Sequence, residues 1–243
     1  MKETIRATSA FLRDRMSGVA TFAVAAALLY LAVPRSNVAF TALTAPLAIF
    51  DLQQGDNPST DQLLQAEADA KAALSYNVET ATLNSQLSYI TLSRLQLNDT
   101  ILDEPEDLRI AVLAVETALK RRPLDAYLWT RYTHLRYLTE DFSPYTLAAL
   151  ERSFLYGPHE VELLQFRMIL CIEAWEMLPP ILRTRTLDQI KLAATMTGLW
   201  GRVLADLSEP ARERLVNFLG ETSADIDRAQ RIAASLQRSR ERN

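Results

Sequence analysis

The sequence predicts an all-α protein in which a single N-terminal transmembrane helix precedes a helical body. Three observations lead to this expectation. Only 6 of the 243 residues are glycine, fewer than the tight turns of strand-rich folds use. Residues 16–34 carry no charge. Most of the remaining chain places apolar residues every three or four positions, which is the period of an amphipathic helix.

The uncharged stretch is long enough to cross a bilayer. A hydrocarbon core of ~30 Å takes roughly 20 helical residues, so we place a transmembrane helix at 17–34, where it would contact membrane lipid. The excess of positive charge lies in the short head at 1–16, and Arg35 is followed by a long stretch without Lys or Arg. This bias predicts a single-pass protein of a bacterial inner membrane, with a cytoplasmic N-terminus and a periplasmic body.

Two alternatives for this stretch stay open. A cleaved signal peptide also has a basic start and an apolar core, and residues 42–45 offer small side chains for cleavage. Against it, Pro46 follows that point directly and the uncharged run exceeds the usual core length. The second alternative is a buried helix of a soluble domain. The anchor and the signal peptide both predict that the body is exported.

Residues 35–58 are predicted as a linker. Their first part, 36–50, lacks charge but is too short to span a membrane. It is therefore expected either at the membrane interface or as a cap on the first soluble helix. Turn-forming residues at 53–59 then separate it from the body.

The region 59–177 is predicted to hold six helices, each with a start or stop signal. The third has the clearest ends, because acids precede it and Lys120, Arg121 and Arg122 close it, as the helix dipole favours. Elsewhere Ser59 or Thr60 caps a start, and Asn77, Asn98-Asp99 and Gly157-Pro158 mark ends. The expected helices lie at 60–74, 83–95, 105–122, 127–138, 144–154 and 161–177.

The region 178–243 is predicted to be a C-terminal helical cap. Leu178-Pro179-Pro180 breaks the chain before a helix at 186–207. A second helix begins at Pro210, since proline suits a first turn, and stops at Gly220. Thr222 and Ser223 then cap a final helix that extends to Leu236.

A weak internal repeat is visible in the residues near the ends of these helices. Leu119, Pro123 and Trp129 recur 35 residues later as Phe154, Pro158 and Leu164, and Ala72, Ala73, Asn77 and Leu83 fit more loosely. This pattern resembles the tetratricopeptide repeat (TPR), a helix–turn–helix unit of about 34 residues. Thr133 and Met168 depart from it where the repeat has glycine, and about a dozen inserted residues separate the first two units. Over 60–175 the resemblance implies a TPR-like helix-pair solenoid that binds a partner on its concave face.

The residues that usually carry chemistry are scarce. The chain has one cysteine (Cys171), two histidines (His134 and His159) and none of the common catalytic motifs. We therefore predict a protein that is not an enzyme, with no catalytic residue, no cofactor and no metal. Cys171 is expected to act as a small buried hydrophobe. Nucleic acid is not expected as a partner, because residues 36–243 are net acidic.

Aromatic residues gather between 127 and 156. Most are expected to pack between helices, but Tyr127, Tyr137 and Tyr145 fall off the main apolar stripe. Together with Arg131 and Arg136 they form the candidate partner-binding surface, suited to a peptide or a sugar chain.

These features predict a membrane-anchored periplasmic scaffold or adaptor that binds a protein partner in envelope assembly or export. One alternative is an accessory protein or enzyme acting on envelope polysaccharide or peptidoglycan, with Glu116, Glu140 and Glu151 as candidate carboxylates. Another is a small subunit of a membrane complex, since small residues in the span permit close helix packing. These small residues are Gly18, Ala23, Ala26 and Ala27.

Overall fold

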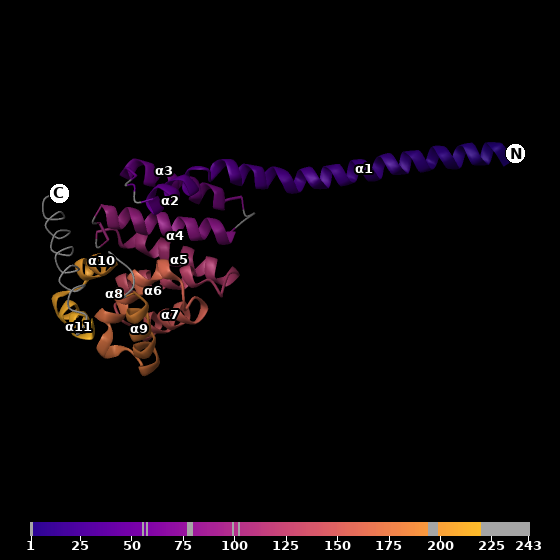
Figure 1. Ribbon diagram of the computed structural model, residues 1–243. Helices are drawn as coiled ribbons and strands as arrows, with labels where there is room; N and C mark the ends of the chain where they lie inside the picture. Colours follow the sequence, from indigo (N-terminus) through magenta and orange to yellow (C-terminus); the bar gives the residue numbers. More distant parts are fainter. Residues whose placement is uncertain are drawn as a thin grey trace. The chain divides into compact units, whose positions relative to one another are not determined.

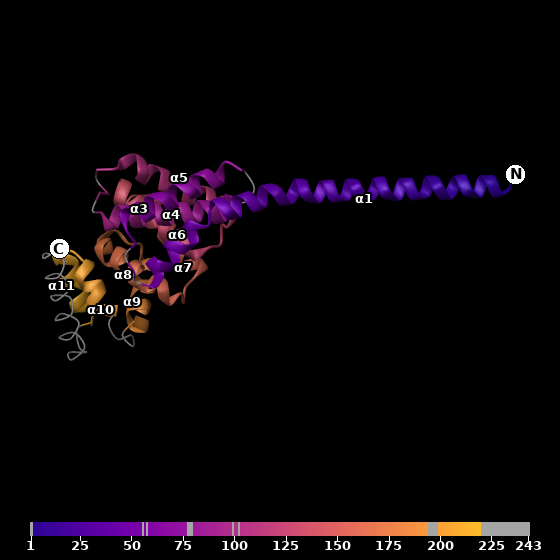
Figure 2. The same ribbon diagram turned by 90° about the horizontal axis from the view of Figure 1, so that it is seen from above.

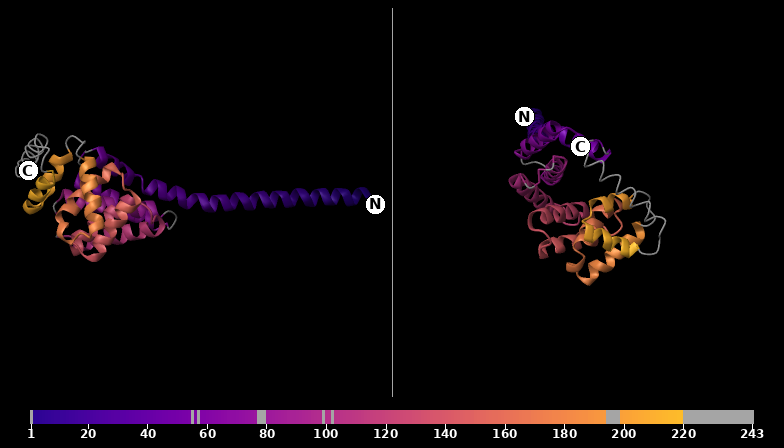
Figure 3. Two further views of the ribbon diagram at one scale, coloured as in Figure 1. Left: turned by 60° about the horizontal axis from the view of Figure 1, so that its bottom comes forward. Right: turned by 90° about the vertical axis from the view of Figure 1, so that its left-hand side faces the viewer.

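The computed structural model describes residues 2–54, 56, 58–76, 80–98, 100–101, 103–193 and 199–219 (Figure 1). All regular structure in these residues is helical, and Figure 3 shows the same helices from two further sides. The all-α prediction is therefore confirmed. Asn77, the stop at Gly220 and the predicted final helix at 222–236 lie outside the described residues.

The chain forms two compact units, Met1–Asn98 (unit 1) and Asp99–Asn243 (unit 2). This division falls inside the predicted repeat region 59–177 rather than at either of its ends. Each unit is described separately below.

Unit 1 holds four helices. These are α1 (Lys2–Thr41), α2 (Thr44–Gln54), α3 (Thr60–Leu74) and α4 (Thr80–Leu97). Within α1, Thr21–Thr41 is long and apolar enough to cross a membrane, with a mean hydropathy of 1.4, and it is the one such stretch among the described helices. Its side chains are almost all exposed, unlike those of a core helix in a soluble domain. An N-terminal apolar helix is thus present, as predicted.

The helix does not end at Pro34, where the predicted transmembrane segment ends. The helix continues through Pro34 to Thr41. Proline removes one backbone N–H donor from a helix. The next residue, Arg35, donates from its guanidinium to the Leu31 carbonyl oxygen at 2.8 Å. The segment 35–58 also differs from the expected linker, because α2 and the end of α1 occupy most of it.

The core of unit 1 forms where α3 and α4 pack side by side (Figure 2). Ser59 begins α3 with a capping box, in which its hydroxyl accepts from the Gln62 N–H while the Gln62 side chain accepts from Ser59. The last turn of α1 joins this core, since Val38 packs with Ala73 and Leu83. The end of α1 is therefore part of the packed body of unit 1, as α2 is.

Unit 2 holds the remaining described helices. They are α5 (Pro105–Arg121), α6 (Ala126–Glu140), α7 (Pro144–Tyr156), η1 (Val161–Leu163), α8 (Leu164–Glu173), η2 (Trp175–Met177), α9 (Pro180–Ala193), α10 (Leu199–Asp206) and α11 (Glu209–Leu219).

Two predicted helices of unit 2 are interrupted. The helix expected at 161–177 is α8 with a short 3₁₀ turn at each end, a common form of helix terminus. The helix expected at 186–207 is replaced by α9, which begins at Pro180, and by α10. Residues 194–198 between them lie outside the described part of the chain. The start at Pro180 follows from the preference of proline for a first helical turn.

Candidate functional site

The candidate site lies on one face of the α6–α7 pair in unit 2. Helix α6 contributes Trp129, Tyr132 and Arg136, whose spacing of three and four residues puts them on one side of the helix. Helix α7 packs against α6 and contributes Tyr145 and Arg152. We call these five residues the arginine–aromatic row.

The side chains of the row contact one another in sequence. The Arg152 guanidinium lies 4.6 Å from the centre of the Trp129 ring, and that ring meets Tyr132 edge to face with 6.0 Å between centroids. Arg136 lies 5.7 Å from the Tyr132 ring and 5.8 Å from the Tyr145 ring. Cation–π attraction of this kind holds each guanidinium group against the aromatic rings beside it.

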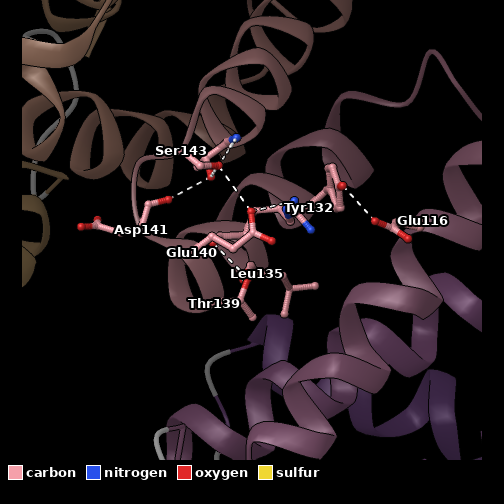
Figure 4. Close-up of polar contacts among 9 residues, drawn as sticks. Glu116, Tyr132, Leu135, Thr139, Glu140, Asp141 and Ser143 are labelled. Carbon is pink, nitrogen blue, oxygen red and sulfur yellow. Dashed lines mark hydrogen bonds and ion pairs between the residues drawn. The ribbon is translucent and has the colours of Figure 1, made fainter.

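Hydrogen bonds fix the α6 side chains in place. The Trp129 Nε1–H donates to the Pro123 carbonyl oxygen at 2.7 Å. The Tyr132 hydroxyl donates to Glu116 Oε1 at 2.9 Å, and Arg136 pairs with Glu140 at 2.7 Å (Figure 4). Burial, together with the bond to Glu116, raises the pKa of Tyr132 to about 12. Tyr132 therefore stays a protonated donor at neutral pH.

The outer members of the row are the ones open to a partner. Tyr145 is 71% exposed. Arg152 is exposed, and it forms no ion pair with any residue that the structure describes. A guanidinium stacked on an indole still presents its N–H groups at the edge, where it can take a carboxylate.

Of the five predicted surface residues, the structure brings only Arg136 and Tyr145 into this row. Tyr127 donates to Glu160 at 3.0 Å and also to Glu162. These hydrogen bonds, together with burial, raise its pKa. Its hydroxyl is thus occupied by two carboxylates of its own unit.

The other two predicted residues are less accessible than expected. Tyr137 packs its ring 4.6 Å from Phe142, beside a buried cluster. It was expected on the surface because it falls off the apolar stripe of α6, but the neighbouring Phe142 covers it after the helix ends. Arg131 is half-buried and already takes part in an interaction.

Sequence reasoning missed Trp129, Tyr132 and Arg152. The spacing of Trp129, Tyr132 and Arg136 was a usable signal for one shared face of α6. The sequence instead predicts that most aromatic residues of this region, Trp129 among them, pack between helices. Arg152 gives no such signal, because it reaches Trp129 from a different helix.

Four side chains of the kinds that often carry chemistry are engaged or buried within unit 2. Glu116 and Glu140 both flank the row, but one accepts from Tyr132 and the other pairs with Arg136. The His134 ring packs at a tilt against Phe166 with 4.1 Å between centroids, and burial lowers its pKa to about 3. Burial also raises the pKa of Cys171 to about 12, which keeps it a thiol. Among the described residues no three His, Cys, Asp or Glu side chains are placed to hold a metal ion.

A cavity of about 520 Å³ lies beside the end of α7 and along α9, also in unit 2. Phe154, Leu155 and Leu192 give it an apolar wall, and Arg185 and Gln189 contribute polar groups. Gln189 donates from Nε2 to the Pro158 carbonyl oxygen at 3.3 Å. The sequence gives no indication of this cavity, because its walls come from separate segments of the chain.

Comparison of this chain with protein-family models, with curated protein sequences and with solved structures finds no match. The fold and the site define its class as an all-helical protein with an apolar N-terminal helix and an arginine–aromatic surface.

Proposed function

We propose that this protein is a membrane-anchored, non-enzymatic helical scaffold of a bacterial envelope. The observation that carries the proposal is the exposed apolar stretch Thr21–Thr41, which runs directly into the packed body of unit 1. An exposed surface of this size is unfavourable in water and favourable in a bilayer. The basic residues ahead of it favour a cytoplasmic N-terminus and a periplasmic body.

The proposed body is a TPR-like solenoid. Support comes from helices that follow one another in the chain and pack on one another, namely α5 on α6, α6 on α7 and α8 on α9. The repeated residues fall at matching places: Pro123 and Pro158 each come two residues after the end of α5 and α7, and Trp129 and Leu164 lie in the first turns of α6 and α8. A helix-pair repeat places its residues in this way.

The partner is proposed to be a protein segment that binds the arginine–aromatic row. It would bring a carboxylate to Arg152 and a flat or apolar side chain to Tyr145. Aromatic and arginine residues are enriched among those that dominate binding energy at interfaces. The flat face of a sugar ring also suits Tyr145, which keeps a polysaccharide ligand as the alternative.

Site-specific photocrosslinking in intact cells tests this proposal. Benzoylphenylalanine replaces Tyr145, and the matched control carries it at Tyr76, which is 42% exposed in unit 1. We expect a discrete protein adduct from position 145 that is absent from position 76 and is lost when Arg152→Glu reverses the charge of the row. An adduct unaffected by Arg152→Glu, or a carbohydrate adduct, would contradict the protein-partner proposal.

A second experiment tests the anchor. Reporter domains fused after residue 60 are expected to be active only in the periplasm, and the chain is expected in the membrane fraction. Leu29→Arg with Val33→Arg should move it out of that fraction, because charge at the centre of a span opposes insertion. Reporter activity in the cytoplasm would overturn the topology.

A further inference from the structure

Helix α2 carries an exposed apolar face. Pro46, Leu47 and Phe50 are separated by one and three positions, so they line one side of the helix. Leu43, which is also exposed, lies in the turn just before it. Leu47 is 59% exposed and Phe50 is 57% exposed. No charged residue lies anywhere from 36 to 50, so this segment brings no charge of its own into the apolar face.

The opposite face of α2 is fixed to the body of unit 1. Ala45 and Ala48 are buried, and α2 packs on both α3 and α4. At the start of α2 the Thr44 hydroxyl donates to Asp69 Oδ2 of α3 at 2.6 Å. The apolar face therefore cannot turn inward, because the alanine face already occupies the contact with the core.

The position of α2 along the chain places it next to the membrane. The candidate span ends at Thr41 and α2 begins at Thr44. The two residues between them, Ala42 and Leu43, form a turn. Three extended residues span at most about 11 Å, which is comparable with the roughly 5–8 Å of headgroup layer on each side of the hydrocarbon core. The first turn of α2 is thus within reach of the headgroup layer.

We infer that α2 is an interfacial helix, whose Pro46–Leu47–Phe50 face, with Leu43 just ahead of it, lies against the lipid at the surface of the membrane. This inference rests on the proposed anchor. Lipid is the proposed occupant because an α1 inserted in the bilayer keeps α2 beside lipid in every molecule. Contact with a second copy would instead depend on the protein concentration. Apolar faces of interfacial helices enter the boundary between headgroups and acyl chains by about 5–10 Å. Unit 1 would then be seated on the bilayer instead of being suspended from a flexible linker.

Spin-label accessibility in lipid nanodiscs tests the inference on the full chain. Cys171 is the single cysteine and is fully buried, so Cys171→Ala provides a cysteine-free background, checked for folding by circular dichroism. Labels are then placed by Leu47→Cys, Leu64→Cys and Ala26→Cys. Leu64 on α3 is the matched control because it is an exposed leucine of the same unit, at 45%, and Ala26 reports on the span.

We expect the ratio of oxygen to nickel-chelate accessibility to be several-fold higher at position 47 than at position 64. Equal, water-like ratios at 47 and 64 with a lipid-like ratio at 26 would overturn the interfacial helix and leave the anchor standing. A water-like ratio at 26 would instead remove the anchor itself. Dipolar broadening between labels at position 47 would show that a second copy, and not lipid, covers the face.

Discussion

Arg167 is a charged side chain that the fold places wholly inside unit 2. It has no exposed surface, and its guanidinium donates to three acceptors at the end of α7. Nε donates to Ser153 Oγ at 2.8 Å, Nη2 to the Ser153 carbonyl oxygen at 2.6 Å and Nη1 to the Gly157 carbonyl oxygen at 2.6 Å. The Ser153 carbonyl oxygen also accepts from the Gly157 N–H, so Arg167 adds a second, charged donor at this helix end and joins α8 to α7.

Replacing Arg167 by Met should destabilise the protein strongly. The apolar side chain fills part of the space but removes three hydrogen bonds from a charged donor to buried acceptors, and hydrogen bonds to charged groups are worth about 1.5–3 kcal/mol each. We expect a loss of about 3 kcal/mol or more in the free energy of unfolding, measured by denaturant titration of the full chain in detergent. Arg121→Met, at an exposed position of α5, is the control, with a change within about 0.5 kcal/mol. Equal effects of the two substitutions would contradict the capping role.

His134 should make the stability of unit 2 depend on pH. Its folded pKa is lowered to about 3 by burial, whereas an unfolded histidine titrates near 6.5. The unfolded chain therefore binds the proton first as the pH falls. The stabilising effect is complete above about pH 6.5 and decreases toward pH 3, by at most about 1.4 kcal/mol per pH unit.

Comparison with a variant that cannot titrate isolates this contribution. Between pH 7 and 4, His134→Leu should lose less unfolding free energy than the unchanged chain, whereas His159→Gln, at an exposed histidine, should follow the unchanged chain. The measurement is a denaturant titration at each pH. Parallel pH profiles for the chain and for His134→Leu would refute the prediction.

At the scale of helices, a buried ion pair joins α3 to α4. Arg94 Nε lies 3.0 Å from Glu67 Oε2, and both side chains are only 4% exposed. Lys71, one turn further along α3, reaches the other oxygen of Glu67 at 2.6 Å. Such a pair fixes the register of two helices, but removing both charges often leaves stability unchanged, because desolvation offsets the attraction.

This balance predicts an asymmetry between single and double substitutions. Glu67→Leu alone should cost about 3–5 kcal/mol, because it leaves the Arg94 charge buried. Adding Arg94→Met should recover most of that loss. Thermal unfolding followed by circular dichroism provides the measurement, and Glu106→Leu, which breaks an exposed pair with Arg109, is the control with little expected change. A double variant less stable than the single one would rule out the desolvation argument.

At the scale of the whole molecule, the chain divides at Asn98 into two compact units. A compact unit with its own core can open without the rest of the chain. Glu67 lies in unit 1 and Arg167 in unit 2, so substituting either residue perturbs one unit locally.

Hydrogen exchange should report the two perturbations separately. Glu67→Leu is expected to accelerate amide exchange in α3 and α4 while α7 and α8 keep their protection, and Arg167→Met is expected to do the reverse. The full chain in detergent, followed by mass spectrometry of peptic fragments, gives the rates for both variants side by side. Acceleration in both units by either substitution would mean that they unfold as one.

The sequence by itself determined the helical content, most helix starts and the apolar stretch in α1. These depend on neighbours within one or two turns: the Ser59 cap, the proline at the start of α7 and the uncharged run are all local. Only the tertiary structure decided which side of α2 is exposed, that Tyr137 is covered by Phe142, and that Arg152 completes a row begun on α6. Each of these depends on contacts between helices, and the periodicity of a single helix does not specify which neighbour will cover which face.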